Sequence, residues 1–188
     1  MCGFEHKQEA ERFLKAFEER LARFGLELHA EKTRLIEFGR YAQKNRAQRG
    51  EGEPETFTFL GFTHRCGRNS RGNFALERRS DRKRQEAKLQ SIKQTLRQRI
   101  HERVAVVGQW LRAVVNGYIQ YHGVPGNLSS LYRFRDRIRS YWRGVLQRRS
   151  QTGRISVIRM SRLADRWLPH PRVVHPYPEI RFAATHPS

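Results

Sequence analysis

The clearest pattern in the chain is a helical spacing of apolar residues, and it occurs in four segments. Residues 8–25 place apolar side chains three and four positions apart and end in Gly25, which is typical of a helix terminus. Residues 80–100, 105–123 and 131–149 repeat this spacing in the second half. The sequence therefore predicts one amphipathic helix near the start and three later ones.

The three later helices carry the predicted core. Ser80 is placed to cap the first of them, because a serine hydroxyl accepts a hydrogen bond from the first turn. The expected buried positions are Leu89, Ile92, Leu96, Ile100, Val107, Trp110, Leu111, Val114, Tyr118, Tyr121, Leu131, Phe134, Ile138, Tyr141, Trp142 and Val145.

Between these helices the pattern changes to alternation of apolar and polar residues, which is typical of strands. Residues 26–39 alternate on both sides of a turn near Glu31, which suits two short strands. Residues 56–64 and 73–78 predict a β-hairpin, because the glycines and asparagine between them favour a turn.

Two segments show neither pattern. Residues 43–54 are polar and contain glycine and proline, so we expect a loop. Residues 167–182 hold four prolines and predict an extended segment packed on the protein.

The expected fold class is α+β, in which an N-terminal helix and short antiparallel strands precede a basic three-helix bundle. This divides the chain into residues 1–79, residues 80–152 and a proline-rich, basic tail over residues 153–188.

Charge adds a functional direction. The 188 residues have a net charge of +20 and a pI near 11.3. Residues 1–56 carry 11 basic and 11 acidic residues, whereas residues 78–103 carry a net +7 and residues 133–166 a net +9. Such asymmetry suggests a neutral packing unit joined to a basic unit that binds a polyanion. A membrane surface is the weaker alternative, because lipid-binding helices pair their charge with a continuous apolar face.

The basic side chains of the later helices are the candidate nucleic-acid contacts. Tyr141 and Trp142 lie among these arginines, and we interpret them as mainly core residues and the arginines as phosphate contacts. The residues expected on one basic face are Arg135, Arg139, Arg143, Arg148 and Arg149, and those expected on the opposite wall of the same groove are Arg82, Lys83, Lys88, Lys93 and Arg97.

Candidate catalytic chemistry is sparse. Eleven of the 18 acidic residues precede residue 57, mostly on a helix face beside basic residues, and no Asp-Asp pair occurs. Cys2 and Cys66 form no zinc pattern, and His170 and His175 have no partner ligands nearby in sequence. No self-contained metal site is expected. The low cysteine content and the lack of a signal peptide or long apolar run suggest a cytoplasmic protein.

Four segments, taken in order, resemble the C-terminal half of bacterial group II intron reverse transcriptase/maturases. They are LKAFEERLARFGLELHAEKTRLIEFGR, TFTFLGFTH, WLRAVVNGYIQYHGVPGN and YWRGVLQRRSQ. The resemblance extends from about residue 3 to residue 182, and it is specific in combination although each motif alone is weak.

The resemblance implies a role for each part of the chain. Residues 1–79 would form the end of the polymerase palm, in which Lys32 matches the lysine that donates a proton to the departing pyrophosphate. The helices would form the thumb, or maturase domain, which grips template–primer and intron RNA. The residues that match the primer grip are Phe59, Leu60, Gly61 and Phe62.

The departures from the family pattern are as informative. The fingers, most of the palm and the Tyr-Ala-Asp-Asp motif are not in this sequence, so it carries none of the carboxylates that bind the two Mg²⁺ ions. Mg²⁺ is expected only in a complete family member, and Lys32 has no reaction to serve here by itself. The expected function is therefore binding of intron RNA or an RNA–DNA duplex without polymerisation.

Three alternatives remain open. The chain could be half of a split polymerase that an N-terminal reverse transcriptase half completes in trans, docked on Phe13, Phe17, Leu21 and Phe24. It could instead be a general basic helical RNA-binding protein, for which little RNA selectivity and a steep salt dependence are expected. It could also be a truncated remnant without a selected function.

Overall fold

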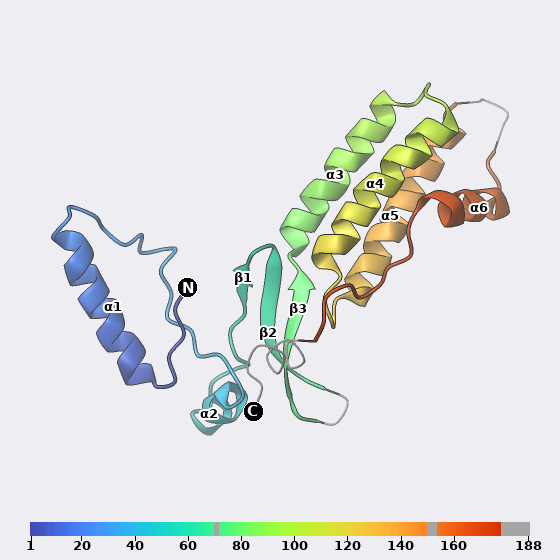
Figure 1. Cartoon of the computed structure of the whole chain (residues 1–188). Coiled ribbons are helices and arrows are strands. Elements are labelled where there is room, and N and C mark those ends of the chain that lie inside the picture. The colour runs from blue at the N-terminus through green and yellow to red at the C-terminus, as the bar shows by residue number, and fades with distance from the viewer. Residues whose placement is uncertain (70–71, 150–153, 178–188) are drawn as a thin grey trace. The chain divides into compact units, whose positions relative to one another are not determined.

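The computed structural model describes residues 1–69, 72–149 and 154–177, and its fold class is α+β as expected (Figure 1). The elements follow one another along the chain as α1 (Lys7–Ala22), α2 (Ala42–Gln48), β1 (Phe57–Phe59), β2 (Phe62–Arg68), β3 (Phe74–Ser80), α3 (Arg82–Gln98), α4 (Val104–His122), α5 (Leu128–Gln147) and α6 (Val157–Trp167).

The chain forms two compact units. The first, here called the N-terminal unit, consists of residues 1–56 and 65–76. The second, the helical unit, consists of residues 57–64 and the chain from residue 77 onward. The sheet has the order β1-β2-β3, and its strands contribute to both units.

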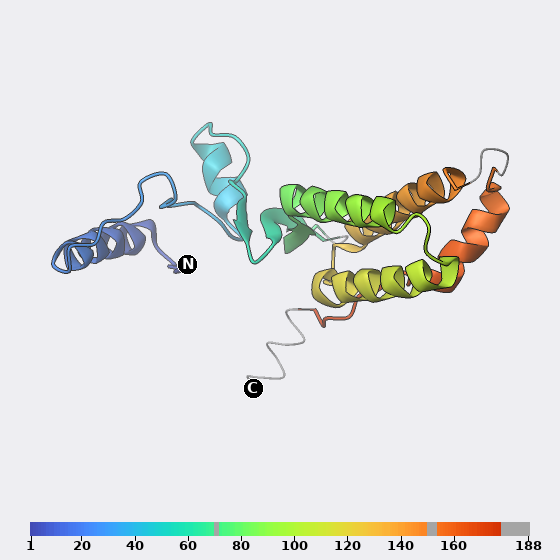
Figure 2. The same ribbon diagram turned by 90° about the horizontal axis from the view of Figure 1, so that it is seen from above.

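The helical unit contains the core. Helix α3 packs along α5, and α6 crosses at one end against α4 and α5 (Figures 1 and 2). The buried apolar side chains come from all four helices, so the unit is not the bundle of three helices that the sequence predicted. Its core residues include Leu89, Ile92, Leu96, Val107, Leu111, Val115, Tyr118, Leu131, Phe134, Ile138, Trp142, Val145, Met160, Ala164 and Trp167.

Most of the predicted core positions are confirmed, with one exception. Ile100, Trp110, Val114 and Tyr141 are partly buried and pack against the core. Tyr121 was expected inside, but its side chain is 52% exposed. The reason is its hydroxyl, which donates a hydrogen bond to the Leu60 carbonyl oxygen (2.8 Å) at the protein surface.

The prediction of one strand over residues 56–64 is wrong, because a two-residue turn divides it. Strands β1 and β2 pair antiparallel, with Phe59 opposite Phe62. Leu60 and Gly61 form the turn with φ angles of 48° and 76°. Two successive positive φ values are typical of the hairpin turn whose twist matches that of the strands, and glycine adopts the second at no steric cost.

The second predicted turn is confirmed between β2 and β3. The Asn69 amide donates to the Asn73 carbonyl oxygen (2.8 Å), and Gly72 has a φ of 78°. Residues 70 and 71 of this turn lie outside the described residues.

Two helices were missed in the sequence. Helix α2 overlaps the segment expected to be a loop. It begins at the buried Ala42, and the Asn45 side chain donates to the Glu37 carboxylate (3.1 Å). Helix α6 lies in the expected tail, where the Ser156 side chain accepts a hydrogen bond from the Arg159 amide (3.2 Å) as an N-cap. Both helices are short, so their apolar residues give only a weak periodic signal in the sequence. The packing of a few small or aromatic side chains stabilises them.

Residues 168–177 of the proline-rich segment form neither helix nor strand. The Val174 and His175 amides donate to the Gly123 carbonyl oxygen (2.8 and 3.1 Å), so this segment packs at the end of α4. Residues 178–182 of the predicted segment lie outside the described residues.

Two local predictions in the first half of the chain are wrong. Residues 26–39 form no strand within the described chain, because no neighbouring strand there accepts their backbone hydrogen bonds. The cap of α3 is Asp81, whose carboxylate accepts from the Arg84 amide (2.8 Å). Ser80 is instead the last residue of β3, where its backbone amide donates to Asn127 (2.9 Å).

The N-terminal unit has almost no core. Within its described residues, the only buried apolar side chains are Ala10 and Ala42. Phe4 and Phe13 contact each other with ring centroids 5.1 Å apart, and Phe13 stacks on Phe17 (5.7 Å), yet all three remain exposed. The apolar face of α1 therefore lacks the cover that an amphipathic helix needs for stability.

Candidate nucleic-acid interface

A cluster of side chains marks where α3 and α5 meet at the surface. A guanidinium nitrogen of Arg137 (Nη2) donates to the Glu86 carboxylate at 3.1 Å and to the Tyr141 hydroxyl at 2.7 Å. Lys93 lies over the Tyr141 ring, with Nζ 5.3 Å from the ring centroid. These contacts place Glu86 and Lys93 of α3 against Arg137 and Tyr141 of α5.

Helical spacing extends this cluster along both helices. Lys93 and Arg97 follow Glu86 by about two and three turns, and Arg82 precedes it by about one turn. On α5, Arg133 precedes Arg137 by about one turn and Arg148 follows it by about three. We call this surface the α3–α5 face; its basic residues are Arg82, Lys83, Lys93, Arg97, Arg133, Arg137 and Arg148, and its one described acidic residue is Glu86.

The face is available to a ligand. Six of its seven basic residues are exposed and Lys93 is half-buried. The Tyr141 hydroxyl and the Glu86 carboxylate stabilise the charged guanidinium and raise the pKa of Arg137. The surface therefore presents permanent positive charge that one carboxylate only partly compensates.

The structure separates the arginines that the sequence placed on one face of α5. Arg135 is 7% exposed, and its guanidinium donates to the Leu168 carbonyl oxygen (3.2 Å) and to Asp165 (3.2 Å). It thereby caps the end of α6 and is not available to a phosphate. This role of Arg135 was not predicted, because α6 itself was missed in the sequence.

The remaining predicted residues divide between two sides. Arg139 follows the buried Arg135 by one turn, and helical spacing puts Arg143 and Arg149 on that side as well. Lys88 lies on the side of α3 opposite Glu86 for the same reason. Arg148 belongs with the α3–α5 face, together with Arg82, Lys83, Lys93 and Arg97, so the predicted groove is only partly assembled.

Two basic residues of the α3–α5 face, Arg133 and Arg137, were missed in the sequence. The signal was present, because Arg137 precedes Arg148 by 11 residues, which is almost a whole number of helical turns. The sequence alone does not show which side of α5 stays exposed, because this depends on where α6 packs.

A buried polar network joins the β1–β2 turn to the helices. The Asn127 side chain is fully buried; its amide nitrogen donates to the Ser80 hydroxyl (2.9 Å) and to the His122 carbonyl oxygen (2.8 Å). The Ser80 hydroxyl also lies 3.2 Å from His122 Nδ1. The β1–β2 turn itself is held by the next residue, Asp81, whose amide donates to the Gly61 carbonyl oxygen (2.9 Å).

Burial sets the protonation state of this network. It lowers the pKa of His122 to about 4, since no acidic group compensates the charged imidazolium. The Phe62 ring lies 5.0 Å from the imidazole and the Tyr118 ring 4.1 Å. His122 is therefore neutral near pH 7 and packs as an aromatic ring.

The residues that match the primer grip form one end of the helical unit. Phe62 is buried and stacks on Tyr121 with ring centroids 5.7 Å apart. Phe59 and Leu60 are exposed, on the strand end and the turn that the buried network holds. The motif thus combines one anchored aromatic residue with an exposed apolar tip.

Lys32 and a possible metal site are the two remaining candidates for catalytic chemistry. Lys32 belongs to the N-terminal unit, where its side chain is exposed and its amide donates to the His29 carbonyl oxygen (3.0 Å). Within the described residues, no group of three or more His, Cys, Asp or Glu side chains is arranged to hold a metal ion.

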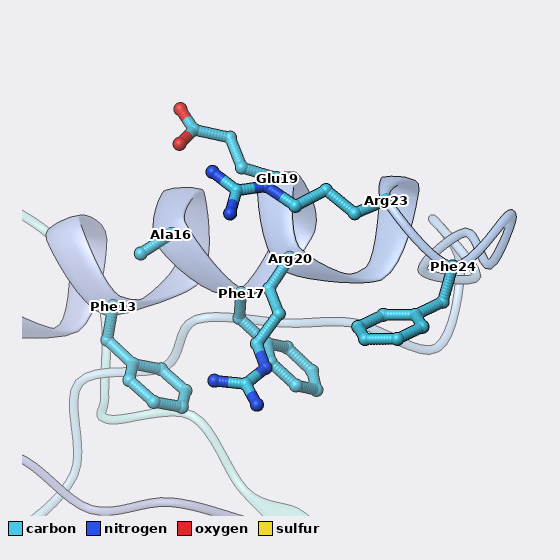
Figure 3. Close-up of a pocket in the computed structure, with 7 residues that line it drawn as sticks. All are labelled: Phe13, Ala16, Phe17, Glu19, Arg20, Arg23 and Phe24. Atoms are coloured by element: carbon cyan, nitrogen blue, oxygen red, sulfur yellow. The ribbon is translucent and has the colours of Figure 1, made fainter.

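The N-terminal unit offers a hollow along α1 instead. It has a volume of about 650 Å³, and its aromatic side chains point to one side of the helix, with Arg20 beside them (Figure 3). Its lining residues are Phe13, Ala16, Phe17, Glu19, Arg20, Arg23 and Phe24.

Comparison with known protein families, curated proteins and solved structures finds no match to this chain. No described helix has the length and apolarity required to cross a membrane.

Proposed function

We propose that this chain binds structured RNA through the α3–α5 face, as a thumb-like fragment of a group II intron reverse transcriptase/maturase. The observation that carries the proposal is the concentration of seven basic side chains with one acidic residue on a face of a unit that has its own core. Neutralisation of phosphates by such a surface releases counterions and supplies most of the affinity for nucleic acids.

Phosphate contact rather than base stacking fits this surface. Arg82 and Arg97 are 15 positions apart on α3, so the basic side chains extend over roughly 22 Å, enough for several phosphates along one strand. Tyr141 is the one aromatic side chain in the cluster, and Arg137 and Lys93 already contact it. Intron RNA is the proposed ligand because of the sequence resemblance, and an RNA–DNA duplex is the alternative with the same phosphate chemistry.

The proposal excludes polymerisation by this chain alone. The 188 residues contain no Tyr-Ala-Asp-Asp motif and no Asp-Asp pair. Two-metal phosphoryl transfer needs clustered carboxylates that hold both ions, so Mg²⁺ would act only in a complete family member. The proposal places the protein in the cytoplasm, where its two free cysteines, Cys2 and Cys66, stay reduced.

A salt series tests the proposal. The purified chain is titrated into a labelled intron-like RNA and into a length-matched DNA duplex at increasing KCl concentrations. Selective binding to the RNA that survives moderate salt supports the maturase function. Equal affinity for both ligands, lost as salt rises, would leave only a general basic RNA-binding protein.

Paired variants locate the interface. The double substitution Lys93→Ala/Arg137→Ala should weaken binding and reduce the salt slope by about two, since two phosphate contacts are lost. The matched control is Lys88→Ala/Arg139→Ala, which also removes one lysine and one arginine, but from the other sides of α3 and α5. An equal loss in both variants would show that binding does not depend on this face.

A second candidate function, that of one half of a split reverse transcriptase, is favoured by one observation. The α1 helix exposes Phe13, Phe17 and Phe24 around a hollow, and its unit buries only two alanines within the described residues. A chain that carries the palm carboxylates would cover these rings. Primer extension should then appear only when both chains are mixed, and Phe13→Asp/Phe17→Asp should abolish it without changing RNA binding by this chain.

A further inference from the structure

Tyr141 occupies a central place on the α3–α5 face. Its hydroxyl accepts a hydrogen bond from Arg137 Nη2 (2.7 Å), and the Arg137 guanidinium carbon lies 5.5 Å from the ring centroid. Lys93 Nζ lies 5.3 Å from the same centroid. One half-buried aromatic residue thus contacts two cations that belong to two different helices.

Other cations of the face are not ordered in this way. Within the described residues, the side chains of Arg97, Arg133 and Arg148 have no hydrogen-bond, ion-pair or ring contact. Long basic side chains that sample many rotamers lose conformational entropy when they bind a phosphate. A side chain that is already held near its binding geometry loses less, which raises affinity without adding a contact.

Glu86 completes the arrangement. Its carboxylate accepts from Arg137 Nη2 at 3.1 Å, and both side chains are about half exposed. An exposed ion pair of this kind is weak, so a phosphate can replace the carboxylate. Tyr141 keeps its contacts with Arg137 and Lys93 whether or not Glu86 remains paired.

We propose that Tyr141 is a positioning residue of the α3–α5 face, which holds Arg137 and Lys93 in the free protein so that both meet neighbouring phosphates of a nucleic-acid strand. The inference rests on the proposed function and identifies what organises that site. It assigns Tyr141 no direct contact with a base, because both cations already occupy the space around its ring.

Tyr141→Phe tests the hydrogen bond to Arg137 alone, since the ring and its packing are kept. Affinity for a labelled RNA hairpin should fall roughly three- to tenfold, the cost of one charge-assisted hydrogen bond that orders the site. The salt slope should stay unchanged, because the number of phosphate contacts is the same. Arg137→Ala should instead reduce the slope by about one.

A double-mutant cycle separates positioning from other effects. In the Arg137→Ala background, Tyr141→Phe should have no further effect on affinity, because the group that it positions is absent. Additive losses would overturn the inference. Tyr132→Phe is the matched control, since Tyr132 is an exposed tyrosine of α5 about half a helical turn away from the Tyr141 side, and its affinity should equal that of the wild type.

A measurement without RNA keeps the inference testable if the proposed function fails. Nitrogen-15 relaxation of the Arg137 guanidinium should show an ordered side chain in the wild type and a mobile one in Tyr141→Phe, while the melting temperature stays within a few degrees. Equal Arg137 mobility in both proteins would overturn the positioning role. Ordered Arg137 in a protein that binds no RNA hairpin would instead refute the proposed function.

Discussion

The two units of this chain use their apolar residues in opposite ways. In the helical unit, aromatic and aliphatic side chains from α3, α4, α5 and α6 are buried together, and Leu111, Ile138 and Trp142 have no exposed surface. In the N-terminal unit, the largest apolar side chains remain at the surface, and within the described residues only Ala10 and Ala42 are buried.

Charge follows the same division. The N-terminal unit carries a net +3, because Arg65, Arg68 and Arg71 add to a neutral segment of residues 1–56, whereas residues 78–103 and 133–166 carry a net +16 between them. Net charge of one sign destabilises a compact state through self-repulsion, so a basic surface requires a core that outweighs it. The unit with a complete core thus also carries most of the charge, and the less charged N-terminal unit is the one that needs further apolar cover.

A pair of core-directed substitutions should show the largest difference between the units. Leu111→Ala should lower the free energy of unfolding by about 2–5 kcal/mol, because it leaves a cavity in a fully packed core. Phe17→Ala in α1 should cost less than about 1 kcal/mol, since its ring is already 38% exposed. Urea unfolding measures both, and similar losses would contradict the contrast.

Two glycines of α4 sharpen the account of the core. A methyl group at Gly108 would stand 2.5 Å from the Trp167 ring, so Gly108→Ala should displace α6 and destabilise the unit by about 1–3 kcal/mol. Gly117 has open space around it, and Gly117→Ala should stabilise the helix by roughly 0.5–1 kcal/mol. Thermal unfolding with tryptophan fluorescence checks both, and a red shift is expected only for Gly108→Ala.

Acid should weaken the helical unit through His122. Burial lowers the pKa of His122 in the folded state to about 4 from its usual 6.5, so the unfolded chain binds the proton first. Stability is therefore complete above about pH 6.5 and falls as the pH decreases towards 4, by on the order of 2 kcal/mol. Urea unfolding of the wild type and His122→Gln over this range should show the smaller pH dependence in the variant.

The smallest expected effect concerns Lys32. Because Lys32 lies in the N-terminal unit and outside the α3–α5 face, Lys32→Ala should leave affinity for the RNA hairpin within about twofold of the wild type. Filter binding beside Arg137→Ala provides the comparison. A loss as large as that of Arg137→Ala would place part of the nucleic-acid interface in the N-terminal unit.

Periodicity alone predicted the elements that are long and strongly amphipathic. Helices α1, α3, α4 and α5 lie where the apolar spacing placed them. Gly25, which was expected to end the first helix, has a φ of 67° in the turn that follows α1. The signal is clear there because a long helix repeats its apolar stripe over several turns. Helices α2 and α6 have too few turns for that, and α6 also stands among prolines and arginines.

The candidate site was predictable in composition but not in arrangement. The sequence identified α3 and α5 as basic, yet it could not tell that Arg135 faces α6 or that Arg137 faces α3. That choice depends on which helix packs on each side of α5, and no local spacing contains this information. The turn at Leu60 and Gly61 was also missed, although the alternation breaks there: Phe59 and Leu60 are adjacent apolar residues, and Phe62 follows Gly61.

Residue type and local spacing were sufficient to predict the fold class, the main helices and the location of the positive charge. Only the tertiary structure shows which arginines make internal contacts and which remain exposed at the surface. The physical reason is that burial of a guanidinium depends on the neighbours that pack around it. In α5 these neighbours are α3 and α6, whose contacting residues lie 30 or more positions away in the chain.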